Sequence, residues 1–170
     1  MSKPYTRLNN NAAAVLLVDH QTGLLSLVRD IDPDKFKNNV LALADIAAYF
    51  KLPTILTTSF EDGPNGPLVP ELQEQFPDAP YIARPGQINA WDNEDFVKAV
   101  KATGRKQLLI AGVVTEVCVA FPALPAIGLC VVLGVRQARV LDRKDRRTAL
   151  GFMAASVVVT AGVVASRFLE

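Results

Sequence analysis

Residues 13–19, Ala13-Ala-Val-Leu-Leu-Val-Asp19, decide the fold. The run is apolar from end to end, rich in branched side chains, and closed by a carboxylate, which is typical of a strand buried on both faces. Such a strand belongs to a parallel sheet that is covered by helices on either side. Its polar end, Asp19, marks the edge at which a functional site would open.

Similar runs recur along the chain and are expected to pair with the first. We predict further strands at Pro53–Ser59, Tyr81–Arg84, Gln107–Gly112, Leu129–Val135 and Val157–Thr160. Repeated strand–helix units imply right-handed crossovers that pack helices back on the sheet. The predicted fold is therefore an α/β three-layer αβα sandwich with a mainly parallel, Rossmann-like central sheet.

Helix signals lie between these strands. Asp32-Pro33-Asp34 is a start signal for a helix whose apolar residues recur through Phe50, and Asp92 is expected to cap a helix over Asn93–Thr103 that Gly104 ends. Two further helices are predicted at Glu71–Gln75 and near Asp145–Ala155. A third is predicted to begin with Thr115 as its N-cap and to be kinked by Pro122.

Length and composition favour one ordinary globular domain over residues 1–170. The chain is 50% hydrophobic and 21% charged, and a domain usually needs about 100–200 residues. Eighteen basic and seventeen acidic residues give a net charge of +1, so no overall field would attract nucleic acid. The basic residues of 143–147 alternate with aspartates, as on a solvated helix start.

Neither membrane nor export is expected. The apolar stretch Leu150–Ala165 falls short of the roughly 20 residues that span a bilayer, and Met1–Asn11 lacks the apolar core of a secretory signal. We therefore expect a cytoplasmic protein whose two cysteines, Cys118 and Cys130, are thiols.

Three polar residues follow predicted strands and could meet at one edge of the sheet: Asp19, Arg84 and Cys118. With Thr115 as N-cap, Cys118 would lie among unsatisfied backbone N–H groups, which lower a thiol's pKa and favour the thiolate. Each residue also has a structural interpretation. Cys118 could be a small core residue, Asp19 a cap for the next turn, and Arg84 a surface ion pair.

Three motifs together resemble the isochorismatase-like cysteine hydrolases, and among them the YcaC branch. The motifs are Leu17-Val-Asp-His-Gln21, Ala83-Arg-Pro-Gly86 and Ala111-Gly-Val-Val-Thr-Glu-Val-Cys-Val119. The likeness extends from about Lys3 to Leu124. It weakens from Pro125 onward, where Val135–Arg139 stands in place of a strand that would end near Asp-Ala.

The resemblance implies a mechanism and a set of site residues. Asp19 would be the general base, Cys118 the nucleophile that forms a thioester, and Arg84 an electrostatic partner at a position where the wider family usually has lysine. The peptide between Val113 and Val114 would be cis. The N–H groups of Val114 and Cys118 would form an oxyanion hole.

Other implied features concern ligands and assembly. Phe60, Trp91 and Phe121 could line a substrate pocket, although plain packing explains each equally well. The lone histidine, His20, cannot supply the histidine pair of the metal-binding nicotinamidase branch, so no metal or other cofactor is expected. Relatives commonly form homo-oligomers, and self-association is expected here.

The leading functional hypothesis is hydrolysis of a small amide or related C–N bond through a Cys118 thioester. An alternative is a catalytically silent family member that acts as an oligomeric scaffold or small-molecule binder, which the arginine at position 84 and the altered tail motivate. A thiol redox protein is a third, minor interpretation, because the chain contains no Cys-x-x-Cys.

Overall fold

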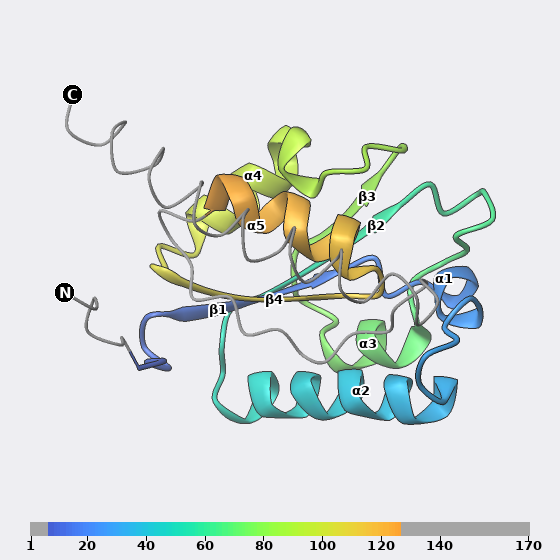
Figure 1. Cartoon of the computed structure of the whole chain (residues 1–170). Helices are drawn as coiled ribbons and strands as arrows, with labels where there is room; N and C mark the ends of the chain where they lie inside the picture. The colour runs from blue at the N-terminus through green and yellow to red at the C-terminus, as the bar shows by residue number, and fades with distance from the viewer. Residues whose placement is uncertain (1–6, 127–170) are drawn as a thin grey trace, which may run out of the picture.

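Four parallel strands form the central sheet of the computed structural model, which describes residues 7–126 (Figure 1). In chain order they are β1 (Ala13–Val18), β2 (Thr54–Ser59), β3 (Tyr81–Arg84) and β4 (Gln107–Gly112). Across the sheet the order is β3-β2-β1-β4. The register aligns the ends of β1 and β4, since Val18 lies opposite Gly112; Val18 also lies opposite Thr57, and β2 continues from there to Ser59.

Burial explains why these segments are strands. Every residue of β1, β2 and β4 is buried, whereas β3, paired on one side with β2, is mostly accessible. The strands β1, β2 and β4 are therefore covered on both faces, and β1 has the continuous apolar character typical of such strands. All four strands were predicted from the sequence to within one residue at either end.

Helices cover both faces of the sheet and complete the three layers (Figure 1). One face carries α1 (Thr22–Ser26), α2 (Pro33–Tyr49) and α3 (Pro70–Gln75). The other face carries α4 (Glu94–Ala102), α5 (Ala120–Ala126) and two short turns, the 3₁₀ turn η1 (Ala90–Asp92) and the π turn η2 (Thr115–Val119). The predicted α/β sandwich with a parallel sheet is confirmed.

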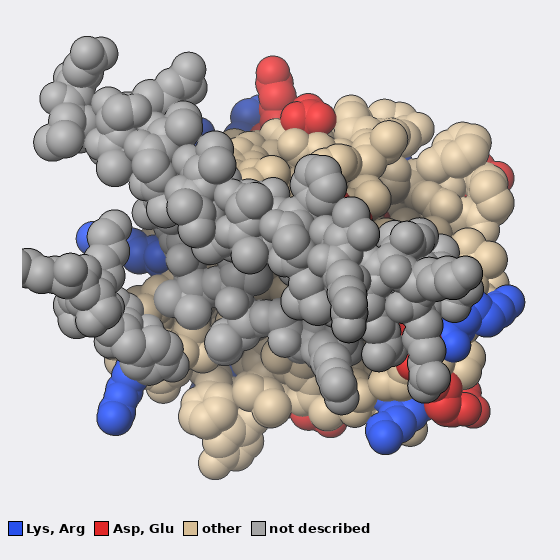
Figure 2. Space-filling model, viewed as in Figure 1, with Lys and Arg blue, Asp and Glu red and all other residues tan. Residues whose placement is uncertain are grey.

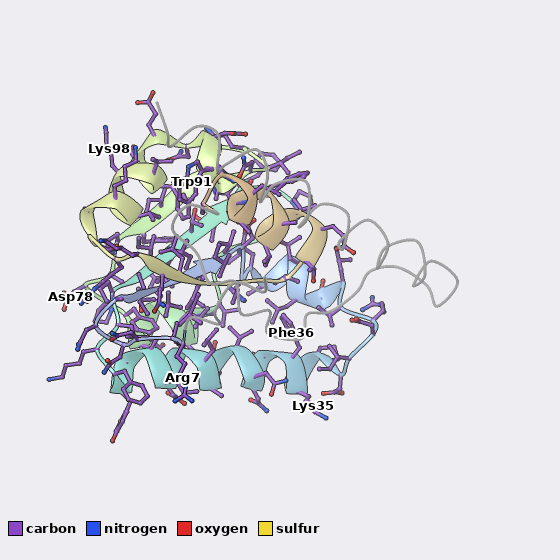
Figure 3. The ribbon with its side chains drawn as sticks, turned by 60° about the vertical axis from the view of Figure 1, so that its left-hand side comes forward. Arg7, Lys35, Phe36, Asp78, Trp91 and Lys98 are labelled. Carbon is purple, nitrogen blue, oxygen red and sulfur yellow. The ribbon has the colours of Figure 1, made fainter. Side chains whose placement is uncertain are left out.

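Two hydrophobic clusters lie on opposite sides of the sheet. Alternate residues of β1 divide between them: Val15 and Leu17 join the cluster under α2, while Leu16 and Val18 join the cluster under α4 and α5. This alternation is the period-two geometry of a strand. In Figure 3, Phe36 points from α2 toward the sheet.

The cap of α2 is as predicted, but the cap of α4 is one residue later than predicted. The Asp32 carboxylate accepts a hydrogen bond from Lys35 N–H at 2.9 Å. At α4 the N-cap is Asn93, whose side chain accepts from Phe96 N–H at 3.0 Å, and not Asp92. Asp92 belongs to η1, so the extended backbone that an N-cap requires falls at Asn93.

The turn that carries Cys118 also differs from the prediction. Thr115 is not an N-cap; it begins the π turn η2, and the capping position is Val114, without a side-chain hydrogen bond. Pro122 lacks an N–H, and its ring would clash with the carbonyl of Cys118, four residues earlier, in a regular α-helix. A wider turn relieves this crowding, and Ala120 N–H reaches back five residues to the Thr115 carbonyl.

The strands predicted at 129–135 and 157–160, the helix near 145–155, and Cys130 lie outside the described residues. Within 7–126 there is no helix with both the length and the apolar character that a bilayer crossing requires. Figure 2 shows acidic and basic side chains at separate places around the part of the described surface that is visible in that view.

Candidate active site

The three residues expected to meet do meet, at the carboxyl edge of the sheet. Asp19 follows β1, Arg84 ends β3, and Cys118 lies in η2. Arg84 Nη2 donates to Asp19 Oδ1 in an ion pair whose side chains are 0% and 5% exposed, respectively. The Cys118 thiol forms a side-chain hydrogen bond with the same carboxylate. Asp19 therefore lies between the cation and the sulfur.

The backbone at Asp19 turns sharply to present its carboxylate. Its φ is +57°, in the left-handed region, which aspartate tolerates better than most residues. Its N–H donates to the Thr57 carbonyl at 2.8 Å, and its own carbonyl accepts from Gln21 N–H at 2.8 Å. A conformation of this kind persists when the surroundings hold it, and such positions cluster at functional sites.

Glycine at position 112 lets η2 approach the ends of β1 and β4. A Cβ atom added to Gly112 would lie 2.7 Å from the Cβ of Cys118 and 3.0 Å from the carbonyl oxygen of Val18. Any larger residue would therefore push Cys118 away from the strand end that carries Asp19.

Arg84 is fixed on every side of its guanidinium. Nε donates to Thr57 Oγ1 at 3.0 Å, and Nη1 donates to the carbonyls of Gln87 and Ile88. Thr57 in turn donates its hydroxyl to the Ile82 carbonyl at 2.8 Å. The sequence did not predict these three partners of Arg84; three of the six residues of β2 are threonines, and nothing local singles out Thr57.

The protonation state of the site differs from the expectation. Burial, together with the neighbouring Asp19 carboxylate, raises the pKa of the Cys118 thiol to about 12, so the resting group is a thiol and not a thiolate. Burial also raises the pKa of Asp19, against the opposing effect of Arg84. The Cys118 N–H is not one of the unsatisfied groups on which the expectation relied, because it donates to the Val114 carbonyl at 2.8 Å.

Of the resemblance-based expectations for the backbone, the cis peptide is wrong and the oxyanion hole stays a prediction. The Val113–Val114 peptide is trans and not cis, the form that a non-proline residue favours by about 3–4 kcal/mol. In addition, the Cys118 N–H is already paired with the Val114 carbonyl. An oxyanion hole that uses Cys118 N–H would have to exchange this hydrogen bond for one to the substrate; a role for Val114 N–H stays a prediction.

His20 is buried beside Asp19 without a hydrogen-bond partner. Its side chain is 1% exposed, and neither ring nitrogen has a partner in the part of the chain that the structure describes. Burial lowers the pKa of His20 to about 4, so the ring is neutral near pH 7.

The three predicted pocket residues have different environments. Trp91 packs against the cluster under α4 and α5 and makes an edge-to-face contact with Phe96 at a ring-centroid distance of 5.9 Å. Figure 3 shows Trp91 on this side of the sheet. Phe60 and Phe121 are 51% and 42% exposed. Packing thus explains Trp91, whereas the other two residues are partly exposed, and their role in a pocket stays a prediction.

Within residues 7–126, no group of three or more His, Cys, Asp or Glu side chains is arranged to hold a metal ion.

Comparison with known proteins places this geometry in a family. The isochorismatase domain model matches residues 13–161 of the chain. A curated relative named "Probable hydrolase YcaC", from Escherichia coli strain K12, is 85% identical over 127 residues. That match covers 75% of this chain, and the chain spans only 61% of the length of that relative.

Two solved structures are also similar. The Escherichia coli YcaC protein, described as an octameric hydrolase of unknown specificity, matches with a TM-score of 0.83 and 71% identity over 91% of this chain and 77% of its own. YcaC from Pseudomonas aeruginosa, solved with hexane-2,5-diol and covalent acrylamide, matches with a TM-score of 0.83 and 68% identity over 91% of this chain and 78% of its own.

Proposed function

The chain belongs to the isochorismatase family, and from this premise we propose that it hydrolyses a small amide or related C–N bond through a thioester on Cys118. The observation that carries the proposal is the buried contact of Asp19 with both Arg84 and the Cys118 thiol. A carboxylate that touches a nucleophile on one side and a fixed cation on the other is the arrangement of an activated nucleophile.

In the acylation step, the Cys118 sulfur attacks the carbonyl carbon of the amide, and the thiol proton passes to Asp19. The resulting tetrahedral intermediate collapses when the C–N bond breaks. The leaving nitrogen takes the proton from Asp19 and departs as an amine, while the acyl group stays on sulfur as a thioester. The raised pKa of Asp19 suits this exchange, since a more basic carboxylate accepts the proton more readily.

Deacylation repeats the proton path with water. Asp19 removes a proton from water as its oxygen attacks the thioester carbon, and the C–S bond breaks as the proton returns to sulfur. The products are a carboxylic acid and the free thiol. Arg84 stays protonated throughout and keeps the carboxylate oriented, because a guanidinium does not release its proton in proteins.

Two properties of relatives support this proposal. The Pseudomonas aeruginosa protein was solved with covalent acrylamide, an electrophilic carboxamide, and a thiolate is a side-chain nucleophile suited to such an adduct. The Escherichia coli protein is an octamer, and we propose that this chain also self-associates. A free thiol at Cys118 agrees with the cytoplasm expected from the sequence.

A catalytically silent scaffold or small-molecule binder is the second candidate. The observation that favours it is the resting state of Cys118, whose pKa is raised to about 12 and whose N–H is already paired. In the proposed hydrolase, Asp19 overcomes this barrier by taking the proton during attack. In a silent protein the thiol would stay inert.

The two functions are separated by trapping an acyl adduct. The protein is incubated with a panel of small amides, quenched in acid, and analysed by intact mass and peptide mapping. The hydrolase predicts an adduct on Cys118 that disappears in Cys118→Ser, forms more slowly in Asp19→Asn, and persists in Cys130→Ser. A folded protein that accumulates no adduct and reacts with electrophiles no faster at Cys118 than at Cys130 would be the silent form.

A further inference from the structure

The cation of the proposed active site is the group that a ligand cannot reach. The Arg84 side chain is 0% exposed, and its guanidinium donates to Asp19, to Thr57 and to two main-chain carbonyls. The Asp19 side chain is 5% exposed. A molecule that approaches Cys118 therefore meets the carboxylate before it meets the guanidinium, and the cation is already neutralised.

The described residues next to this site add apolar surface. Phe60, Ile88 and Phe121 are 51%, 62% and 42% exposed. The Phe60 N–H donates a hydrogen bond to the Arg84 carbonyl at 2.9 Å. The Ile88 carbonyl accepts a hydrogen bond from the Arg84 guanidinium. Phe121 follows Cys118 by three residues and lies in the first turn of α5.

We propose that the site takes uncharged carboxamides with a small apolar body and discriminates against molecules with a carboxylate next to the reacting carbon. Arg84 is already paired with Asp19, so a second carboxylate placed beside Asp19 would lose its hydration, would gain no free cation from the described residues that form the site, and would face a like charge. This inference rests on the proposed function, because it assumes that Cys118 is the reacting group.

Iodoacetamide and iodoacetate test the inference, because they have nearly the same shape and differ in charge. Each forms a bond between Cys118 sulfur and carbon as the C–I bond breaks, iodide leaves, and the thiol proton passes to Asp19 and then to water. The rates at Cys118 are measured near pH 7 by peptide mass spectrometry, in the native protein and in the chain unfolded in urea. The unfolded chain gives the intrinsic ratio of the two reagents.

The expected result is that folding raises the iodoacetamide-to-iodoacetate rate ratio at Cys118 by about tenfold or more, which corresponds to about 1.4 kcal/mol. Asp19→Asn removes the base, so the rates of both reagents fall. It also leaves the guanidinium without its counter-charge, so the iodoacetamide-to-iodoacetate ratio drops below the wild-type value by about tenfold. Asp45→Asn removes a carboxylate of α2 that lies outside the site and is the matched control, in which the ratio stays near that of the wild type.

The outcomes separate the inference from the function. If Cys118 reacts faster than Cys130 but the ratio is the same folded and unfolded, charge selection is wrong and the proposed nucleophile stands. If neither reagent modifies Cys118 of the native protein faster than Cys130, both ideas fail. Circular dichroism shows whether Asp19→Asn folds. If it does not, the comparison of the wild-type ratio in the folded and unfolded protein tests charge selection without the variant.

Discussion

Arginine at position 84 does more than a lysine could at this place. Its planar group reaches Asp19, Thr57 and the carbonyls of Gln87 and Ile88 in different directions, whereas an ammonium is a single point of charge. Arg84 thereby connects β1, β2 and the segment after β3. The substitution that looked like a departure from the wider family also builds the surroundings of the site.

Thr57→Val tests how much this support contributes. Valine has nearly the same shape as threonine but leaves Arg84 Nε without its acceptor, and an unsatisfied buried donor costs about 1–3 kcal/mol. We expect the free energy of unfolding to fall by about 2 kcal/mol, and Cys118 alkylation to slow. Urea unfolding and peptide mapping measure the two effects.

Thr54→Val is the matched control for Thr57→Val. Thr54 lies on the same strand and is buried, and its hydroxyl donates to the Leu52 carbonyl at the opposite end of β2, away from Arg84. It should reduce stability without changing the Cys118 alkylation rate. Equal effects of the two variants on that rate would show that Thr57 plays no part in positioning Arg84.

His20 predicts a measurable sensitivity to acid. Its folded pKa of about 4 lies below the ordinary 6.5, so between these values the unfolded chain binds the proton more tightly. The contribution of His20 to stability is complete above pH 6.5 and declines as the pH falls toward 4. The loss amounts to about 3 kcal/mol, because one pKa unit is about 1.4 kcal/mol.

His20→Leu should remove this component of the pH dependence. Leucine has a similar size and no nitrogen to leave unpaired in the buried site, so its stability near pH 7 should be close to the wild-type value. Urea unfolding of both proteins from pH 7 to pH 4 gives the difference. Asp19, whose pKa is raised in the folded state, acts in the opposite direction and is present in both. Parallel curves would contradict the assignment to His20.

At this scale the sequence could place Asp19, Arg84 and Cys118 at one edge, because the position of a residue relative to a strand end is local information. It could not predict that Cys118 is a thiol with a pKa of about 12, because that value depends on burial and on a carboxylate 99 positions away in the chain. Three-dimensional contacts of this kind leave no local pattern.

Among the elements, α4 offers a direct test of the corrected cap. Asn93→Ala removes the acceptor of Phe96 N–H and should lower the free energy of unfolding by about 1 kcal/mol, as loss of an N-cap usually does. Asp92→Ala is the control, since the Asp92 carboxylate accepts a hydrogen bond from the Asn89 side chain at 3.2 Å and is not the cap. Thermal or urea unfolding of the two variants ranks them, and a larger loss for Asp92→Ala would contradict the structure.

The elements that were predicted correctly are determined by local sequence, whereas the helix caps that were predicted wrongly are determined by backbone angles. The strands β1 and β4 follow from buried, mostly apolar runs, and the capped start of α2 follows from an Asp-Pro pair. The caps of α4 and η2 were misplaced because two adjacent residues can each act as caps at α4, and because Pro122 changes the turn that precedes it. Choosing between neighbouring caps requires backbone angles, which the sequence leaves open.

On the scale of the whole molecule, layering decides where the site lies. Both faces of the sheet are covered by helices, so side chains from several strands can reach a common space at the ends of the strands. The parallel order β3-β2-β1-β4 brings the segments after β1, β3 and β4 to the same edge. The sequence predicted this architecture because strand–helix repetition admits few topologies.

Exposed apolar residues at the end of α2 allow the expected self-association to be tested. Ile46, Tyr49 and Phe50, here called the α2 apolar stripe, are 53%, 81% and 50% exposed. Their spacing of three and four residues places them on one side of the helix end, and contiguous exposed apolar surface usually marks an interaction site. We expect sedimentation to give a particle several times heavier than the 18.4 kDa chain.

The double variant Ile46→Lys/Tyr49→Lys should shift that particle toward the monomer, because burying two ammonium groups in a contact between copies is unfavourable. Lys35→Glu, on the first turn of the same helix, changes charge away from the α2 apolar stripe and should leave the mass unchanged. The ratio of Cys118 alkylation rates in these variants then reports whether the site is complete within one chain. If the double variant sediments like the wild type while remaining folded, the copies meet through another surface, and the α2 apolar stripe is not their contact.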